Sequence, residues 1–442
     1  MTHTDSSKCI VLGAGLTGLT AGFISGSKIY EQTDLPGGLC LTYGILPKNG
    51  TKIFPSRINN NVFRFETGGG HWLWGSDKKA LGFLSSFGQL KKYNRKVSVY
   101  LPDLDLFVPY PLQYNLWKLP RGLANKAFED LTRASREKSE SNTMSNWLTN
   151  VFGQTLCHLF FLPFNTLYTS GLLDKVAPQD SFKNPIDLVK VERGLEKMDN
   201  SLEGYNSVFL YPKATLGTLA WRIASKCDIE YNKKVSEVNL AKRQVGFSDG
   251  TSVKFENAIS TIPLNAMASF ANLENAKHAD PYTSVLVVNI AGPKGRNCPP
   301  DQWIYFPVSR TGFHRIGIYT NVDNLFLPTK LREKNWASFY VEKSYFTKSK
   351  PSSENQQRIA YEIANELVEM GYLDPPELVS PTWVDVAYNW RMVGSNWVEN
   401  SLSSLRNHNV FQVGRYAEWG KYQGMVESIS SARSIISQIN SK

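Results

Sequence analysis

The stretch KCIVLGAGLTGLTAGF, residues 8–23, decides the fold of this chain of 442 residues. Its apolar run Cys9–Leu12 predicts a buried parallel strand. The glycines that follow, Gly13, Gly15 and Gly18, form the G-x-G-x-x-G pattern that turns such a strand into a helix. Glycines there let the backbone approach a pyrophosphate, and the start of the helix offers unpaired N–H groups to the anion. The stretch therefore predicts a Rossmann-type dinucleotide site.

An acidic residue and a second glycine turn narrow the choice of dinucleotide. Residues 29–31 read as the second strand, and Glu31 lies 18 residues after Gly13. This is close to the ~20-residue spacing at which a carboxylate binds a ribose hydroxyl, and a carboxylate there repels a 2′-phosphate. An FAD- or NAD-like ligand is therefore expected. The turn PGGL at residues 36–39 is typical of flavoproteins and favours FAD.

Length and composition indicate a large enzyme without a membrane span. The chain is longer than the ~250–300 residues at which single hydrophobic cores stop growing, so several parts are expected. No stretch approaches the ~18 apolar residues of a membrane helix. The five cysteines show no C-x-x-C spacing, which indicates neither disulfides nor a metal site and predicts a reducing cytoplasm. The net charge of +10 is spread along the chain, which favours a solvated basic surface over nucleic-acid binding.

The sequence patterns predict a discontinuous α/β fold. Amphipathic stretches at 125–138 and 142–156 indicate helices, and a turn at Asp249-Gly250 indicates a β-ribbon. Strands rich in β-branched and aromatic residues are expected at 284–292, 303–308, 314–322 and 336–346. We expect a Rossmann-type FAD-binding domain from residues 1–90, 205–265 and 405–442. An inserted helical domain (115–204) and a mixed or antiparallel β-sheet substrate domain (91–114 with 266–404) complete the expected fold.

Further motifs carry a family resemblance. They are GGGHW at 68–72, VPYPLQYNLWKLP at 108–120, FLPFN at 161–165, VAPQD at 176–180, WIYFP at 303–307 with FHRIG at 313–317, and VGRYAEW at 413–419. Together with the glycine turns, they make the chain resemble the UDP-galactopyranose mutases, particularly the longer eukaryotic type. These enzymes belong to a larger flavoprotein group that includes amine and protoporphyrinogen oxidases.

The resemblance implies an isomerase whose cofactor is reduced FAD. N5 of the flavin would attack the anomeric carbon of a nucleotide sugar and expel the nucleoside diphosphate, and the sugar would reclose as a furanose without net redox change. UDP-galactopyranose or a related sugar is the implied substrate, and NADH or NADPH the implied reductant. The protein would hold the flavin and the sugar together and stabilise the leaving charge.

The resemblance also implies roles for single residues. Arg315 and Lys175 would bind the diphosphate, and His71 would lie against the flavin. The implied substrate-binding residues are Tyr110, Gln113, Asn165, Tyr168, Asn206, Tyr305 and Tyr422. The implied cofactor-binding residues are Gly13, Gly15, Gly18, Glu31, Gly37, Gly38, Leu39, Gly70, His71, Val235, Gly414, Arg415, Gly424 and Met425.

The chain departs from the family pattern mainly at the residues expected to bind the diphosphate. Lys175 stands where the family has a second arginine, so the charge remains but the bidentate fork is lost. Val322 replaces a tyrosine, and Tyr388 is the nearest substitute for another. These departures fit a mutase that acts on a different nucleotide sugar, or a relative with altered chemistry.

Two other functions stay open. An FAD-dependent amine oxidase or desaturase would have an aromatic-caged pocket, for which Trp390 and Trp397 are candidates. A catalytically degenerate FAD-binding protein would explain the lost tyrosines. The polar helices between residues 115 and 200 could pack subunits of a homo-oligomer or face water.

Overall fold

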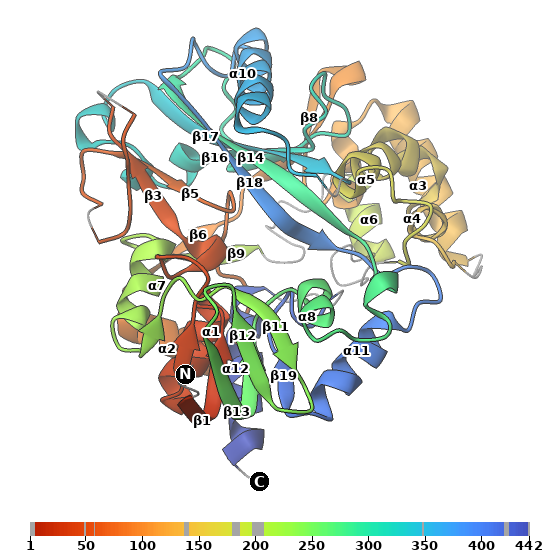
Figure 1. Cartoon of the computed structure of the whole chain (residues 1–442). Helices are drawn as coiled ribbons and strands as arrows, with labels where there is room; N and C mark the ends of the chain where they lie inside the picture. Colours follow the sequence, from red (N-terminus) through yellow and green to blue (C-terminus); the bar gives the residue numbers. More distant parts are fainter. Residues whose placement is uncertain are drawn as a thin grey trace.

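The computed structural model describes residues 5–47, 50–56, 58–136, 141–178, 186–196, 207–346, 349–419 and 424–440. Within these residues two seven-stranded sheets organise the molecule, one at the end that carries both termini and one beneath helix α10 (Figure 1). The α/β fold with a mixed second sheet is thereby confirmed. The domain boundaries stay a prediction.

The first sheet contains the strand that the opening motif predicts. Its order is β10-β2-β1-β13-β12-β11, with β19 paired to β13. β1 runs parallel to both β2 and β13, as in a dinucleotide fold. The bounds are β1 Asp5–Leu12, β2 Lys28–Tyr30, β10 Ile229–Glu230, β11 Val235–Asn239, β12 Gln244–Phe247, β13 Ser252–Ser260 and β19 Val410–Gln412.

Helices cover both faces of this sheet. On one face lie α1 (Leu16–Ser25), α12 (Met425–Asn440), α2 (Lys78–Phe87) and α7 (Leu216–Ala224), which contact one another. On the other face, α8 (Leu264–Phe270) and α11 (Trp397–Arg406) share a core with residues of β1, β11, β12 and β13. α1 begins at the residue that the glycine pattern predicts.

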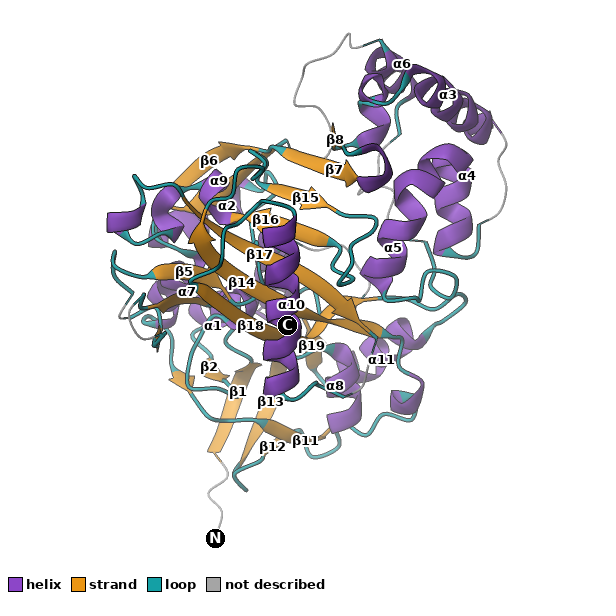
Figure 2. Cartoon of the chain, turned by 90° about the horizontal axis from the view of Figure 1, so that it is seen from above, coloured by secondary structure: helices purple, strands orange, loops and turns teal. Residues whose placement is uncertain are grey.

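The second sheet has the order β18-β14-β17-β16-β15-β7-β8. Only the β7–β15 pair is parallel among its described pairings. Helix α10 (Ser353–Glu369) lies across one face (Figure 2). The bounds are β7 Val97–Leu101, β8 Leu106–Pro109, β14 Tyr282–Pro293, β15 Trp303–Tyr305, β16 Arg315–Ile318, β17 Trp336–Tyr345 and β18 Leu378–Asn389.

The strands predicted at 303–308 and 314–322 are shorter than expected. The first ends with β15 at Tyr305. The stretch 314–322 was expected to be extended throughout, but β16 ends at Ile318 and Tyr319–Val322 forms the short helix α9. The chain turns there and buries Tyr319 against Phe326 and Tyr340, at ring-centroid distances of 4.6 and 4.9 Å. Packing of one aromatic ring therefore overrides the strand propensity of its neighbours.

The expected helices form a separate group beside β7 and β8 (Figure 2). They are α3 (Arg121–Arg136), α4 (Met144–Leu156), a π-helical turn at Cys157–Phe161, α5 (Leu162–Thr169) and α6 (Leu188–Leu195). Their apolar faces share one core with Val99, Leu101 and Val108 of the second sheet. None of the helices among the described residues is both long and apolar enough to cross a membrane.

Short elements complete the fold. β3 (Thr42–Ile45), β4 (Lys52–Ile53) and β5 (Phe63–Glu66) form a three-stranded sheet, and β6 (Leu90–Asn94) pairs with β9 (Val208–Pro212). Turns of 3₁₀ helix occur at Gly38–Cys40, Pro102–Leu104, Leu112–Tyr114, Leu116–Lys118, Ala276–His278, Asn324–Phe326 and Thr329–Leu331.

Candidate active site

The glycine turn after β1 forms a cradle at the start of α1. Gly15 is the N-cap of α1 and no side chain caps this helix end, so its first N–H groups are open to an anion. The second glycine turn packs onto the first, because Gly37 N donates to Ala14 O at 2.8 Å. A Cβ on Gly18 would lie 1.9 Å from Gly13 O, so only glycine allows α1 to sit this close to the strand. The cradle fits a pyrophosphate.

Glu31 lies directly beside this cradle and is buried. Its carboxylate accepts hydrogen bonds from Ala14 N at 2.7 Å and from Thr33 N and Oγ1 at 3.0 and 2.9 Å. The side chain is therefore fixed at the end of β2, where an adenosine ribose lies in dinucleotide folds.

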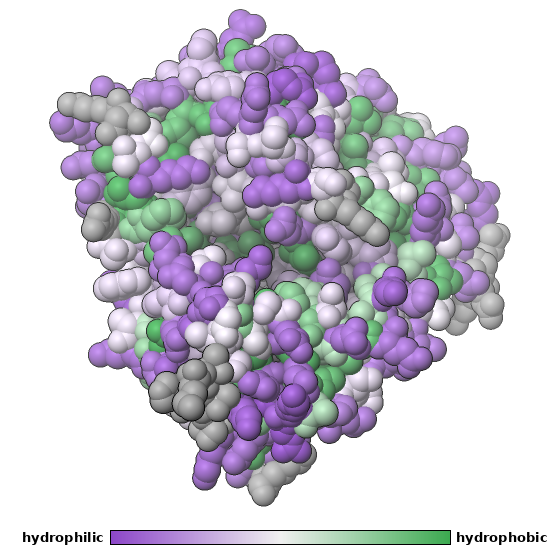
Figure 3. Space-filling view, viewed as in Figure 1, coloured by the Kyte–Doolittle hydropathy of each residue, from purple (hydrophilic) through white to green (hydrophobic). Residues whose placement is uncertain are grey.

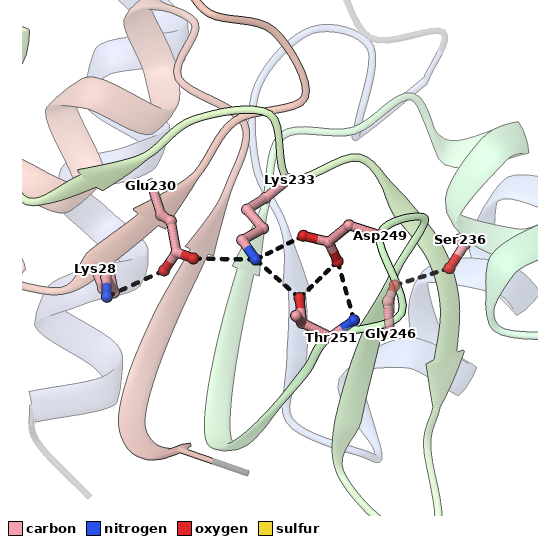
Figure 4. Close-up of polar contacts among 7 residues, drawn as sticks. All are labelled: Lys28, Glu230, Lys233, Ser236, Gly246, Asp249 and Thr251. Carbon is pink, nitrogen blue, oxygen red and sulfur yellow. Dashed lines mark hydrogen bonds and ion pairs between the residues drawn. The ribbon is translucent and has the colours of Figure 1, made fainter. Parts of the chain in front are cut away.

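A network of charged side chains surrounds Lys233 (Figure 4). Lys233 N donates to Glu31 O at 2.8 Å. The ammonium group of Lys233 lies 2.7 Å from Asp249 and 3.1 Å from Glu230, and Glu230 also pairs with Lys28 at 3.1 Å (Figure 4). These contacts raise the pKa of Lys233 and lower that of Asp249. The network holds the chain that leads into β11, which begins at the predicted cofactor residue Val235.

The C-terminal segment returns to the same cradle. Gly414 has φ +95°, and a Cβ on it would lie 3.0 Å from Cγ2 and Oγ1 of Thr17 in α1. Cys40 Sγ, in the turn that begins at Gly38, lies 3.4 Å from Met425 Sδ at the start of α12. The predicted cofactor residues of the first and last parts of the chain, Leu39 and Gly424 among them, thus belong to segments that meet around α1. Asn206 and Tyr422 lie outside the described residues.

The second sheet contributes one row of side chains. Tyr305, Arg315 and Glu342 are direct neighbours across β15, β16 and β17. Cross-strand neighbours point to the same face of a sheet. The alternate residues Ile316 and Val341 lie in the core that α10 covers. The polar row therefore faces away from α10.

Arg315 is held by an ion pair within this row. Its Nη2 lies 2.5 Å from both carboxylate oxygens of Glu342 and 3.2 Å from Tyr388 Oη. Tyr388 in turn donates to Glu342 at 2.8 Å. Burial by itself would raise the pKa of Glu342, but the charge of Arg315, with a smaller contribution from His314, lowers it to about 2. Glu342 is therefore ionised at neutral pH.

Aromatic rings surround the row. Tyr305 packs edge-to-face against Tyr110 at 5.2 Å, and Tyr168 of α5 lies 4.4 Å from Tyr388 and 5.2 Å from Trp390. The structure thus brings together three of the tyrosines predicted to bind substrate, along with Tyr388. Trp397, the other candidate for an aromatic cage, packs elsewhere, against Trp419 in the core of the first sheet.

Two residues predicted to bind substrate, Asn165 and Gln113, are buried in helical turns. Asn165 is buried, and its amide donates to Phe161 O of the π-helical turn at 2.7 Å. Gln113 is buried in the 3₁₀ turn Leu112–Tyr114, three residues after Tyr110. Their roles toward a nucleotide stay predictions.

The glycine loop at 68–71 lies against the polar row. A Cβ on Gly70 would fall 2.1 Å from Tyr340 Oη, and one on Gly69 would fall 3.0 Å from Glu342 Oε1. His71 bonds to Gly69 O through Nδ1 at 3.2 Å, and burial lowers its pKa. This loop therefore joins the part of the chain that carries the cradle to the row on the second sheet.

The two remaining predicted cations are placed differently. The guanidinium carbon of Arg415 lies 5.7 Å from the ring centroid of Tyr388, next to the row. Lys175 is exposed, and no hydrogen bond or ion pair among the described residues joins it to Arg315. The reach of Lys175 toward a diphosphate stays a prediction.

Residue-based reasoning missed three buried polar groups. Glu342 and His314 flank Arg315, and Glu66 precedes the glycine loop. Glu66 accepts hydrogen bonds from Thr42 at 3.0 Å and from Tyr211, and burial raises its pKa to about 7. Charged residues inside strands that are otherwise apolar, such as WASFYVEKSYF, are the signal that could have revealed Glu342.

A space-filling view shows a hollow in the middle of one face, between the part that carries α10 and the part that carries α1, with apolar side chains in it (Figure 3). Polar side chains surround this hollow (Figure 3).

Comparisons with known proteins identify the family of this chain and structures that resemble it. The model of the flavin-containing amine oxidoreductases matches residues 69–432. Among solved structures, reduced UDP-galactopyranose mutase has a TM-score of 0.84 at 20% identity, covering 98% of this chain and 94% of that chain. Wild-type putrescine oxidase bound to putrescine has a TM-score of 0.60 at 12% identity, covering 100% of each chain. The CLA-producing fatty acid isomerase from P. acnes has a TM-score of 0.59 at 12% identity, covering 98% of each chain.

These structural likenesses establish the fold, which is the one expected from the resemblance to the mutases and oxidases. The family match covers most of the chain and accounts for the flavin that the second glycine turn predicts. The chain belongs to the flavin-containing amine oxidoreductase family.

Proposed function

We propose that this protein is a flavin-dependent mutase that interconverts the pyranose and furanose forms of a nucleotide sugar, UDP-galactose or a relative of it. One observation carries the proposal: Arg315 and Tyr305 are paired in a row that packs against the glycine loop preceding His71. A cation for a diphosphate and the loop expected beside the flavin therefore share one site. Reduced flavin, when bound, supplies the nucleophile toward the anomeric carbon.

Arg315 would bind the diphosphate and stabilise its charge as it leaves the sugar. Its Nη2 is occupied by Glu342 and Tyr388, whereas its Nε is buried without a hydrogen-bond partner among the described residues. An arginine fixed in this way keeps donors available in a defined direction, and its charge cannot be lost. Pre-oriented donors of this kind stabilise developing negative charge.

The neighbouring rings would hold the nucleotide. Tyr110 and Tyr305 meet edge-to-face beside Arg315, where a base or ribose can pack on an aromatic face. Arg415 would add a second positive charge next to Tyr388. These positions would keep the anomeric carbon close to the flavin, and proximity supplies much of the rate enhancement in such reactions.

A second candidate function follows from Glu342. A buried carboxylate beside Tyr168, Tyr388 and Trp390 also suits a cationic substrate, because carboxylates and aromatic faces both attract cations. This arrangement favours an FAD-dependent amine oxidase as the alternative.

An anaerobic assay with nucleotide sugars distinguishes the two candidate functions. The FAD-loaded protein is reduced with dithionite, NADH or NADPH and given UDP-galactopyranose, UDP-galactofuranose and other nucleotide sugars, and the products are separated by chromatography. Interconversion without net flavin oxidation is expected. The absence of turnover, together with oxygen consumption when amines are added to the oxidised protein in air, would replace the mutase by an oxidase.

A further inference from the structure

We propose that binding of a nucleoside diphosphate to Arg315 is coupled to uptake of one proton by His314, which then replaces Arg315 as the charge partner of Glu342. The inference rests on the proposed function for the nature of the ligand. It concerns a residue to which neither the motifs nor the resemblance gave a role.

His314 is fixed beside the carboxylate. The side chain is buried, its Nε2 lies 3.7 Å from Glu342 Oε2, and its backbone N–H donates to Glu342 O at 3.0 Å. Neither ring nitrogen has a hydrogen-bond partner among the described residues. Buried polar groups without partners are rare in folded proteins. A small rotation of the imidazole would bring Nε2 within hydrogen-bond distance of the carboxylate.

The groups around the imidazole decide its charge. Arg315 and Glu342 are the charged groups that face it among the described residues. From α5, Phe164 and Tyr168 pack on the ring at 6.0 and 5.4 Å, and Tyr388 of β18 lies at 6.3 Å. Burial lowers the pKa of His314, so the imidazole is neutral at neutral pH while Arg315 satisfies the carboxylate.

A diphosphate changes this balance. An anion that engages Arg315 draws the guanidinium toward itself and places further negative charge next to Glu342. Two neighbouring anions in a buried site raise the pKa of any group that can neutralise them. Histidine is the nearby group whose ordinary pKa is closest to neutral pH, since Tyr168 and Tyr388 have raised values. The proton comes from solvent, an N–H bond forms at Nε2, and no other covalent bond changes.

Isothermal titration of the FAD-loaded, oxidised protein with UDP tests the coupling. Titrations between pH 7.5 and 8.5 are repeated in buffers of different ionisation enthalpy. The slope of the observed binding enthalpy against the ionisation enthalpy of the buffer gives the number of protons taken up. The terminal phosphate of UDP is then already ionised, because phosphate monoesters ionise near pH ~6. We expect uptake of close to one proton, and a Kd that rises about tenfold per pH unit over the range where uptake is complete.

Variants assign the proton to a residue. His314→Phe keeps a ring in the aromatic setting but cannot bind a proton, and it should abolish the uptake; His314→Gln serves as a second variant. His408→Gln, a change of an exposed histidine, should leave uptake as in the wild type. Flavin absorbance checks that each variant is FAD-loaded.

The outcomes separate the two proposals. UDP binding without proton uptake, or uptake that persists in both His314 variants, would overturn the coupling and leave the mutase proposal intact. A wild-type protein that binds neither UDP nor other nucleoside diphosphates would overturn the proposed function itself.

Discussion

At the scale of single residues, the site depends on the pairing of Arg315 with Glu342. In Arg315→Ala, we expect UDP affinity to fall about 10- to 100-fold, because hydrogen bonds to charged groups contribute about 1.5–3 kcal/mol each. The change also leaves Glu342 buried without its partner, which costs about 3–5 kcal/mol of unfolding free energy. Equilibrium titration and urea unfolding measure the two effects.

Arg315→Lys is the matched control. It keeps the charge beside Glu342 but loses the planar fork, so it should recover more stability than UDP affinity. Loss of FAD with unchanged UDP binding in Arg315→Ala would contradict the assignment of this arginine to the substrate.

Glu31→Ala should have the reciprocal effect. The carboxylate holds Ala14 and Thr33 at the cradle, and its loss removes both these bonds and the acceptor for a ribose hydroxyl. We expect FAD affinity to fall while the fraction that retains FAD binds UDP as the wild type does. Fluorescence titration of the apoprotein with FAD measures the first effect, and an unchanged FAD affinity would remove Glu31 from the cofactor site.

Local motifs found some of these residues and could not find others. Gly13, Gly15 and Glu31 lie in one short stretch with fixed spacing, so the sequence predicted their meeting. The contact between Arg315 and Glu342 depends on the register of β16 and β17 across 27 residues of chain. No local pattern encodes that register, so the sequence can mark Glu342 as an unusual charge in an apolar strand but cannot place it beside Arg315.

At the scale of elements, the packing of α1 on β1 depends on one helical glycine. Gly18→Ala places a Cβ 1.9 Å from a backbone oxygen, so we expect a lower melting temperature and weaker FAD binding. Gly82 is a matched control in α2, since a Cβ there meets nothing within 4 Å. Gly82→Ala should stabilise the protein by about 0.4–1 kcal/mol. Equal effects of the two substitutions in calorimetry would contradict this account.

Glu66 at the end of β5 makes stability depend on pH. It is protonated in the folded protein up to about pH 7, because burial raises its pKa from 4.5 more than the hydrogen bonds of Tyr211 and Thr42 lower it. The folded state then binds more protons than the unfolded state, so stability falls as the pH rises from about 4.5 to about 7, by roughly 3 kcal/mol.

Urea unfolding of wild type and Glu66→Gln at pH 5 and pH 8 measures this contribution. The wild type should lose stability relative to the variant between the two values. Glu342, with a pKa of about 2, contributes mainly below this interval. Buried His71 and His314 titrate alike in both proteins, so the difference between them isolates Glu66. Parallel pH profiles would show that Glu66 is ionised or solvated.

At the scale of the whole molecule, the proposed cofactor is held by segments from both ends of the chain. Anything that binds only the folded state stabilises it, by about 2.7 kcal/mol at one hundred times its Kd. We expect FAD to raise the melting temperature of the apoprotein, and riboflavin, which lacks the pyrophosphate and adenosine, to raise it far less. Equal shifts would mean that the cradle and Glu31 contribute nothing to binding.

The first sheet could be predicted from the sequence to a greater extent than the second sheet. The opening motif predicted the parallel sheet because β1, its glycine turn and α1 are a recurrent unit. The order of the second sheet was not predictable, since β7 pairs with β15, where the partner of Val97 is Trp303, 303 − 97 = 206 residues later in the chain. Strand patterns show which residues are extended but not which strands become neighbours.

The pairing of β19 with β13 has a consequence for how the protein is made. β19, Gly414 and α12 are translated long after β1, and after the whole second sheet. The dinucleotide site is therefore incomplete until that late segment has emerged from the ribosome. We therefore expect tight flavin binding only after β19 and α12 have been translated, and the nascent polypeptide must keep the unpaired part of β13 from aggregating until β19 emerges.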